Sequence, residues 1–310
     1  MKSIVEGVIK GNMRAVARAI SVVENDGKMA QEMMKALHPY TGSSIIVGIT
    51  GSPGSGKSTL VDCMVEKLRE KEKKVGIVAV DPTSPFSGGA ILGDRIRMMR
   101  HSLDSEVFIR SMATRGQLGG LAKATGEAIA IFEASGKDFI LVETVGVGQD
   151  EVEVVKFADI IVVILIPGAG DEIQVFKAGI MEIADIFVLN KADSPGAEKM
   201  ERQLRAMLEL GMKEREIPEV IRTVATEGRG VENLIRAIER FMEAKGPVFR
   251  EKRRKRLISW MLKDIIRDEI MGRINSSVDE SEIEELVNEI YRRKKDPYTV
   301  AEEIIARVKR

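Results

Sequence analysis

The residues with the clearest chemical purpose lie at 51–58, which read GSPGSGKS and fit the pattern G-x-x-x-x-G-K-[ST]. The glycines of this segment let the backbone turn tightly and direct N–H groups at phosphate oxygens, and the helix that follows adds the positive end of its dipole. In such a loop the lysine, Lys57, reaches the β- and γ-phosphates, and the hydroxyl of Ser58 binds Mg²⁺. The sequence therefore predicts a P-loop made of Gly51, Ser52, Pro53, Gly54, Ser55, Gly56, Lys57, Ser58 and Thr59.

A second segment with specific chemistry, Asn190-Lys191-Ala192-Asp193, follows the apolar run at 184–189. The spacing N-K-x-D is typical of a base-reading loop, in which the aspartate accepts from guanine N1–H and the 2-amino group. Adenine offers neither donor, so this motif favours GTP over ATP. A further loop at Ala225 and Thr226 is expected to touch the base.

Three carboxylates stand where an open α/β sheet binds its ligands, beyond the ends of its strands. Asp81 closes the apolar run 75–80, and Glu143 closes the run 139–142 in the manner of a Walker-B strand. Asp94 lies in the glycine-rich segment 87–95, whose composition is typical of a switch loop. We expect Ser58 and these carboxylates to serve Mg²⁺, with Lys57, Asp94 and Glu143 as the catalytic residues.

The group that positions the attacking water is left open by the sequence. Glu143-x-x-Gly146 stands where many GTPases have Asp-x-x-Gly, and no glutamine follows the glycine directly; Gln149 comes three residues later. Intrinsic hydrolysis is therefore expected to be slow. Arg110 and Arg115 could contact substrate or be solvated, and both alternatives stay open at this point.

The elements that must position these residues form an α/β pattern. Continuous apolar runs ending in polar loops predict strands buried on both faces of a mostly parallel sheet. Residues 3–37 predict two amphipathic helices, and the break at Gly246-Pro247 begins a helical C-terminal part. The predicted parts are an N-terminal helical extension at 1–42, a P-loop domain at 43–245 and a C-terminal helical arm at 246–310.

Composition excludes several function classes. Lys plus Arg and Asp plus Glu both number 48, so no overall basic field predicts nucleic-acid binding, and the arginine-rich run 250–256 is interpreted as a solvated helix face. The single Cys63 cannot form an internal disulfide. No apolar run predicts a membrane span and no signal peptide is expected, which favours a cytoplasmic location.

Taken together, these segments resemble the methylmalonyl-CoA mutase-associated GTPase family, also labelled arginine/ornithine transport-system kinase. The resemblance rests on residues 51–58, 81–84, 88–94, 143–149 and 190–193, and it spans roughly 44–230, with residues 260–262 and 296–298 extending it. It implies a GTPase that binds GTP or GDP with Mg²⁺ and uses its C-terminal arm for homodimerisation. Its implied task is to gate cofactor loading of an adenosylcobalamin-dependent acyl-CoA mutase and to protect that enzyme.

The resemblance also implies roles for particular residues and a further partner. Asp81, Asp94 and Glu143 would serve Mg²⁺ and the first two switches, and Asp171, Gln174 and Lys177 would form a third switch that touches the mutase. A cobalamin adenosyltransferase is the second implied partner.

Three other functions are compatible with a P-loop. A P-loop kinase could pass phosphate to a small molecule or transport protein, but the segment 190–193 argues against it. A metallochaperone GTPase would carry Cys/His metal motifs, for which one cysteine and two histidines do not suffice. A nucleotide-gated scaffolding module with negligible turnover would differ from a GTPase in measured hydrolysis with and without partner.

Overall fold

The computed structural model describes residues 1–25, 27–81, 99–101, 103–113, 118–144, 157–168, 183–211 and 216–308. Backbone packing divides the chain into two compact units, Met1–Leu257 and Ile258–Arg310. The boundary between these units, at 257/258, differs from the boundaries at 42/43 and 245/246 that the sequence predicts. The three parts expected from the sequence therefore stay predictions.

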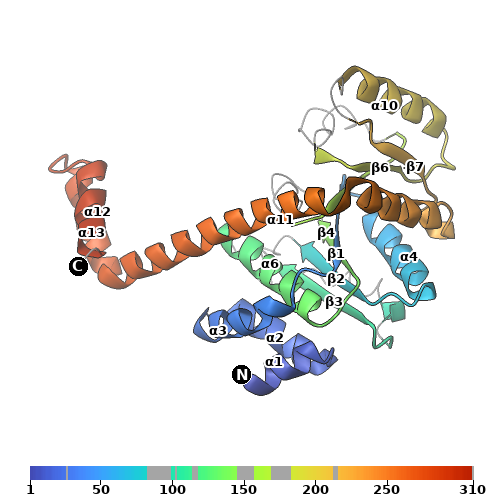
Figure 1. The fold of residues 1–310 in the computed structure, drawn as a ribbon. Coiled ribbons are helices and arrows are strands. Elements are labelled where there is room, and N and C mark those ends of the chain that lie inside the picture. The colour runs from blue at the N-terminus through green and yellow to red at the C-terminus, as the bar shows by residue number, and fades with distance from the viewer. Residues whose placement is uncertain are drawn as a thin grey trace. The chain divides into compact units, whose positions relative to one another are not determined.

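The first unit is built on a sheet of seven strands among the described residues, all paired in parallel, in the order β3-β2-β4-β1-β5-β6-β7 (Figure 1). The strands are β1 (Ile45–Gly51), β2 (Val75–Asp81), β3 (Val107–Ala113), β4 (Phe139–Thr144), β5 (Ile160–Leu165), β6 (Ile186–Leu189) and β7 (Glu219–Arg222). Parallel strands direct their carboxyl ends to one edge, so the polar residues that close the strands gather there. The predicted α/β fold with a mostly parallel sheet is confirmed.

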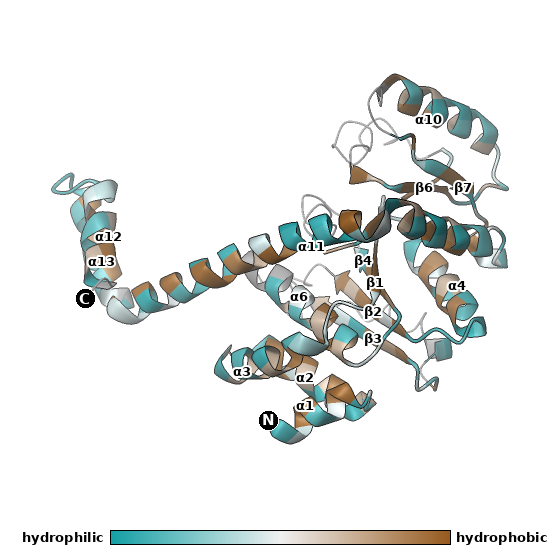
Figure 2. Ribbon diagram, in the orientation of Figure 1, coloured by the Kyte–Doolittle hydropathy of each residue, from teal (hydrophilic) through white to brown (hydrophobic). Residues whose placement is uncertain are grey.

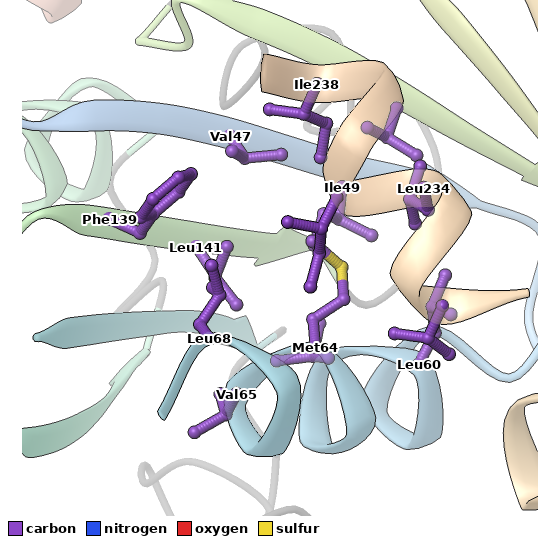
Figure 3. Packing of buried hydrophobic residues seen from close by; sticks show 14 of the residues in the cluster. Val47, Ile49, Leu60, Met64, Val65, Leu68, Phe139, Leu141, Leu234 and Ile238 are labelled. Atoms are coloured by element: carbon purple, nitrogen blue, oxygen red, sulfur yellow. The ribbon is translucent and has the colours of Figure 1, made fainter. Parts of the chain in front are cut away.

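Helices cover both faces of this sheet. One face carries α4 (Lys57–Glu70) and the beginning of α11 (Val231–Ser277), and the other carries α6 (Leu118–Ala134) and α10 (Ala197–Gly211). Because side chains alternate along a strand, Val47 and Ile49 of β1 face α4. Figure 3 shows them packed with Leu60 and Met64 of α4 and with Leu234 and Ile238 of α11. A fully buried aliphatic side chain contributes about 1.5–3 kcal/mol, so this cluster fixes α4, and with it the P-loop, against the sheet.

Three helices precede the sheet, where the sequence predicted two: α1 (Lys2–Ile9), α2 (Met13–Asn25) and α3 (Gly27–Leu37), followed by the 3₁₀ turn η1 (His38–Tyr40). The extra break falls at Gly11, whose φ of +71° lies in the left-handed region. Asn12 then caps α2, since its Oδ1 accepts from Ala15 N at 3.1 Å. α2 also packs on α6, and its Glu24 forms an ion pair with Arg110 of β3, which answers one of the open questions about Arg110.

The predicted break at Gly246-Pro247 is present as a kink within α11 rather than as a loop. Gly246 has φ +65° and ψ −177°, a conformation outside the helical region, and Pro247 follows it. Glycine adopts such a φ without steric cost, and proline is tolerated at the first position of a helical segment because its missing N–H is not needed there.

The interpretation of residues 250–256 as a solvated helix face is wrong for three of its arginines. Arg254 pairs with Asp159 and Glu133 and donates to Ser44 O, and Arg253 donates both terminal nitrogens to Asp185 at 2.6 and 2.8 Å. Arg250 also donates to Ser44 O. Glu133 and Asp159 are buried, and the Asp185 side chain is 10% exposed. Asp159 and Asp185 directly precede β5 and β6, and an unpaired charge at such sheltered positions would be costly. Within this run, Glu251 and Lys255 do form an exposed pair.

The second unit is helical. It comprises the end of α11 from Ile258 onward, α12 (Glu280–Tyr291), whose cap is the Asp279 side chain accepting from Glu282 N, and α13 (Pro297–Val308). Figure 2 shows hydrophobic residues recurring along this part of α11. Within the described residues, no helix combines the length and apolar composition of a membrane span.

Candidate functional site

The loop between β1 and α4 has the backbone that a phosphate-binding loop requires. Gly54 and Gly56 have φ of +76° and +87°. A Cβ at Gly56 would lie 2.5 Å from Asn190 Nδ2, and one at Gly51 would lie 2.4 Å from Ile164 O. Only glycine therefore allows this loop to pass so close to the neighbouring strand and to Asn190. The loop ends on the N-terminus of α4, whose free N–H groups and dipole favour an anion.

Lys57 is the charged group of this loop, and its side chain is buried. Lys57 Nζ donates to Gly51 O at 2.7 Å and to Ser52 O at 3.1 Å, so it lies over the loop that it follows. Backbone carbonyls hold an ammonium group through dipoles only, and a phosphate oxygen offers a full negative charge for the same donors. The position of Lys57 is thus that of a group that can transfer its hydrogen bonds to bound phosphates.

Ser58 and Glu143 meet across the fold although they are 85 residues apart in the chain. Ser58 Oγ donates to Glu143 Oε1 at 2.6 Å, and Glu143 is 4% exposed. β4 places Glu143 at the carboxyl edge of the sheet, in register with Ile49 of β1 and Ala79 of β2. A hydroxyl and a carboxylate held together at the P-loop are the hard oxygen ligands that suit Mg²⁺, which keeps several waters and the phosphates as its other ligands. The residues present therefore fit such an ion.

Asn190 joins three loops. Its Nδ2 donates to Ser55 O of the P-loop at 2.8 Å, and its Oδ1 accepts from Ala225 N at 3.1 Å and from Thr223 Oγ1 at 3.0 Å. Asn190 is 2% exposed, so each of these bonds is made away from water. The phosphate-binding loop and the two loops predicted to hold the base are thereby fixed relative to one another.

The remaining residues of the predicted base site lie beside Asn190. Lys191 has a φ of +53°, in the left-handed region. Asp193, two residues later, has an exposed side chain. Ala192 N donates to Thr223 O at 3.0 Å, which ties this loop to the 3₁₀ turn η3 (Ala225–Glu227). The Ala225 carbonyl accepts from Cys63 Sγ of α4 at 3.0 Å. An exposed carboxylate on a firmly held loop can accept hydrogen bonds from an entering base.

Other predicted site residues are not tested by this geometry. Asp81 is the last residue of β2, at the same edge of the sheet as Glu143, and its side chain is outside the described part. The predicted switch residues and the second arginine left open above also lie outside the described residues: Asp94, Arg115, Gln149, Asp171, Gln174 and Lys177.

Sequence reasoning missed Thr223 and the Cys63 contact with Ala225. Thr223 had a usable signal, since it follows β7 and precedes the predicted base loop by two residues. Cys63 had none, because nothing in a helical sequence indicates which distant carbonyl a thiol meets. Burial and the neighbouring Asp62 carboxylate raise the pKa of the Cys63 thiol, which favours the protonated form that donates this bond.

A phosphate-binding loop on a parallel sheet, an acidic strand end beside its serine and a guanine-reading loop tied to it together define a P-loop GTPase. Residues 16–279 match the family described as "Methylmalonyl Co-A mutase-associated GTPase MeaB", and the chain belongs to that family. It hydrolyses GTP.

Similar proteins are found in archaea and in animals. A putative GTPase of Pyrococcus abyssi is 49% identical over 98% of this chain and 96% of its own. The mouse protein "Methylmalonic aciduria type A homolog, mitochondrial" is 35% identical over 82% of this chain and 66% of its own. A solved structure titled "Crystal structure of LAO/AO transport system kinase" has a TM-score of 0.70 and 23% identity, covering 100% of this chain and 97% of that one, and supports the fold.

Proposed function

We propose that this GTPase is a chaperone of an adenosylcobalamin-dependent acyl-CoA mutase of the methylmalonyl-CoA mutase type. The observation that carries the proposal is the family match over residues 16–279, whose description names association with that mutase. The name of the mouse relative, which refers to methylmalonic aciduria, is in keeping with it. The GTPase gates cofactor loading and protects the mutase from inactivation, in the cytoplasm, and a cobalamin adenosyltransferase is a further partner.

The proposed chemistry uses Mg²⁺ at the P-loop. Ser58 and Glu143, together with Asp81 and Asp94, hold the ion, and the ion supplies charge neutralisation for the phosphates. Lys57 transfers its hydrogen bonds from the loop carbonyls to the phosphate oxygens. Asn190 keeps the P-loop and the base loop in one arrangement, so that Asp193 reads guanine while the phosphates are held.

In this proposal the residues of the third switch, Asp171, Gln174 and Lys177, couple GTP hydrolysis to binding of the mutase. The chain lacks a glutamine directly after Gly146, so a partner that orders the switch loops or supplies a group in trans could speed hydrolysis by orders of magnitude. Substituting these three residues by alanine should leave GTP affinity and the basal rate nearly unchanged while removing stimulation by the mutase.

Two measurements test the proposal. Co-purification from native lysate with GDP and with a non-hydrolysable GTP analogue should recover a cobalamin-dependent mutase in a nucleotide-dependent manner. Single-turnover hydrolysis with and without that mutase should then show stimulation of the wild type only. Absence of stimulation by any cobalamin mutase contradicts the chaperone role, and unchanged stimulation of the triple variant contradicts the third-switch role.

A homodimer is proposed for the same protein, with the C-terminal arm as the contact. The second unit exposes large apolar side chains at helical spacing, in one row on α11 and another on α12. On α11 these are Ile258, Leu262, Ile265, Ile266 and Ile270, and on α12 they are Ile283, Val287 and Tyr291. Exposed apolar rows of this kind mark protein contacts in soluble proteins.

A kinase is the second candidate, because a solved structure with this fold carries a transport-system kinase title. The chain's own base-reading segment at 190–193 favours a GTPase. Incubation with labelled GTP distinguishes the two, since a GTPase releases inorganic phosphate without an added acceptor and a kinase transfers label to one.

A further inference from the structure

The helix α4 is joined to the turn η3 as well as to the P-loop. It begins at Lys57, directly after the P-loop, and its buried face packs in one apolar cluster with Ala225 of η3. Cys63 follows Lys57 by six residues, about 9 Å along the helix axis, and its Sγ donates to the Ala225 carbonyl at 3.0 Å. One helix therefore contacts both the loop that holds phosphates and the turn that is expected to touch the base.

The backbone of Ala225 is held at both of its polar groups. Its N–H donates to Asn190 Oδ1 at 3.1 Å, and its carbonyl accepts from the Cys63 thiol and from Gly228 N, the latter at 3.2 Å. Ala225 is 3% exposed, so water has little access to these groups. Without the thiol, the carbonyl keeps only the bond that closes its own turn, and no hydrogen bond from the carbonyl joins η3 to α4.

The bonds around Ala225 close a ring. Asn190 Nδ2 donates to Ser55 O of the P-loop at 2.8 Å, and Asn190 Oδ1 accepts from Ala225. Ala225 leads to α4 through Cys63, and α4 leads back to the P-loop along the chain. A fully satisfied buried network is more rigid than its separate bonds, because moving one member strains the others. The ring includes the two parts of the protein that a nucleotide must reach at once.

The thiol is held in the form that donates. Burial and the neighbouring Asp62 and Glu66 carboxylates raise the pKa of Cys63, so the sulfur keeps its proton at neutral pH. Its acceptor is a neutral carbonyl, and a hydrogen bond between neutral groups is expected to change an affinity that depends on it about fivefold.

We propose that Cys63 is a positioning residue for guanine binding: its contact with Ala225 holds η3 on α4 and sets the distance between the base turn and the P-loop. The inference rests on the base site proposed for 190–193 and 225–226, and it adds a residue outside both segments. ADP presents the same phosphates as GDP but not the guanine edge that this site reads. Loss of the contact should therefore lower the affinity for GDP about fivefold and leave that for ADP unchanged.

The test is displacement of a fluorescent GDP analogue from the full chain by GDP and by ADP. Cys63→Ala removes the donor, whereas Cys63→Ser keeps a donor and changes a single atom. The ratio of GDP to ADP affinity should fall about fivefold in Cys63→Ala and stay near the wild-type value in Cys63→Ser. Glu66→Ala, at an exposed position of α4 three residues later, is the control and should keep the wild-type ratio.

Three results of this measurement overturn the inference. An unchanged ratio in Cys63→Ala shows that the contact does not serve the base. Equal losses for GDP and ADP show that the residue supports the fold or the P-loop in general. An equal fall of the ratio in Cys63→Ala and Cys63→Ser shows that the sulfur acts through packing and not through its hydrogen bond.

Steady-state GTP hydrolysis separates positioning from catalysis. The contact is made to the base turn, so Cys63→Ala should raise KM for GTP about fivefold and leave kcat at the wild-type value. A fall in kcat with KM unchanged overturns the inference.

Infrared spectroscopy observes the hydrogen bond itself. Cys63 is the single cysteine of the chain, so its S–H stretching band is free of overlap from other thiols. The band should lie below that of a thiol without an acceptor, and a band at the frequency of a free thiol overturns the inference.

The wild type keeps the inference separate from the base site on which it rests. If the wild type binds GDP and ADP equally, the base site proposed for 190–193 and 225–226 is wrong, and the role of Cys63 is wrong with it. If the wild type prefers GDP and Cys63→Ala keeps the full preference, the base site stands and the positioning role of Cys63 alone is wrong.

Discussion

At the scale of single residues, the asparagine and the aspartate of the base-reading segment have different tasks. Asn190 is buried, and its side chain forms three hydrogen bonds within the protein, with Ser55, Thr223 and Ala225. Asp193 is exposed and remains available to a ligand. One residue shapes the site and the other reads the base, although the sequence presents them as one motif.

Asp193→Asn should change nucleotide preference without changing the fold. The aspartate accepts from two guanine donors, and an asparagine leaves one of them unmatched, which costs about 2 kcal/mol, or roughly thirtyfold in affinity. Xanthine, which has an oxygen in place of the 2-amino group, should then bind better than guanine. Calorimetry with GDP, XDP and ATP measures this. Equal affinity of the wild type for GTP and ATP would refute the assignment.

Ser58 and Glu143 should behave as one unit in catalysis. Ser58→Ala removes the hydroxyl oxygen from the proposed Mg²⁺ site, and Glu143→Gln removes the negative charge of the carboxylate there. Each should lower hydrolysis about a hundredfold, equivalent to about 3 kcal/mol. The double variant should be little worse than either single one, because the two groups serve the same ion. Rates at several Mg²⁺ concentrations measure this. Independent, additive losses would show that the two residues do not share a metal.

At the scale of elements, the helix α6 shows how burial changes the chemistry of a charged residue. α6 packs against the sheet on one side and against the N-terminal helices, and Phe132 lies over Gly76 of β2, where a Cβ would be 2.7 Å from the ring. Glu127 on this helix is buried, and burial raises its pKa to about 7, which Lys123 only partly opposes. The carboxyl is thus protonated in the fold at pH values where it is ionised in the unfolded chain.

The free energy of unfolding should therefore depend on pH through Glu127. The folded pKa of about 7 exceeds the ordinary value of 4.5, so the contribution is fully present below 4.5 and is lost as pH rises through 7. The full difference corresponds to about 3 kcal/mol. Denaturant unfolding at pH 5 and pH 8 should show most of this loss in the wild type and not in Glu127→Gln. Glu6→Gln, on an exposed position of α1, is the control; an equal loss in Glu127→Gln contradicts the assignment.

The helix α11 is the second element in which packing decides the role of charged residues. Arg253 and Arg254 satisfy Asp185 and Asp159, the residues directly before β6 and β5. Asp159 also accepts from Ile46 N at 3.0 Å, so one carboxylate joins the start of β1 to the helix. The amino ends of three strands are thereby held by side chains that the sequence alone places on a solvated face.

At the scale of the whole molecule, the proposed dimer can be tested through its apolar row. Leu262 and Ile266 lie one turn apart on α11, and both are about half exposed. Replacing both with aspartate would bury charges in a dimer contact, which costs several kcal/mol. The variant should sediment as a monomer at concentrations where the wild type is a dimer. Lys263→Asp, an exposed neighbour, is the control and should not alter the mass; a monomeric wild type would contradict the proposed arm contact.

The local features of this protein follow from short stretches of its sequence. The P-loop, the segment 190–193 and the buried strands are set by short stretches, because glycine freedom, apolar runs and the helix dipole act over a few residues. From these features the parallel α/β fold and the GTPase class were predicted correctly.

The contacts between distant groups depend on how the whole chain folds. Ser58 finds Glu143 across 85 residues and Asn190 finds Ser55 across 135. Nothing within a short segment fixes such pairs; they follow from the order of the strands and from the layer of side chains that holds α4 to the sheet. The same holds for Arg253, which meets its partner Asp185 only when α11 packs against the sheet. A buried carboxylate needs a partner and an exposed one does not, so the pairing depends on burial that the sequence does not show.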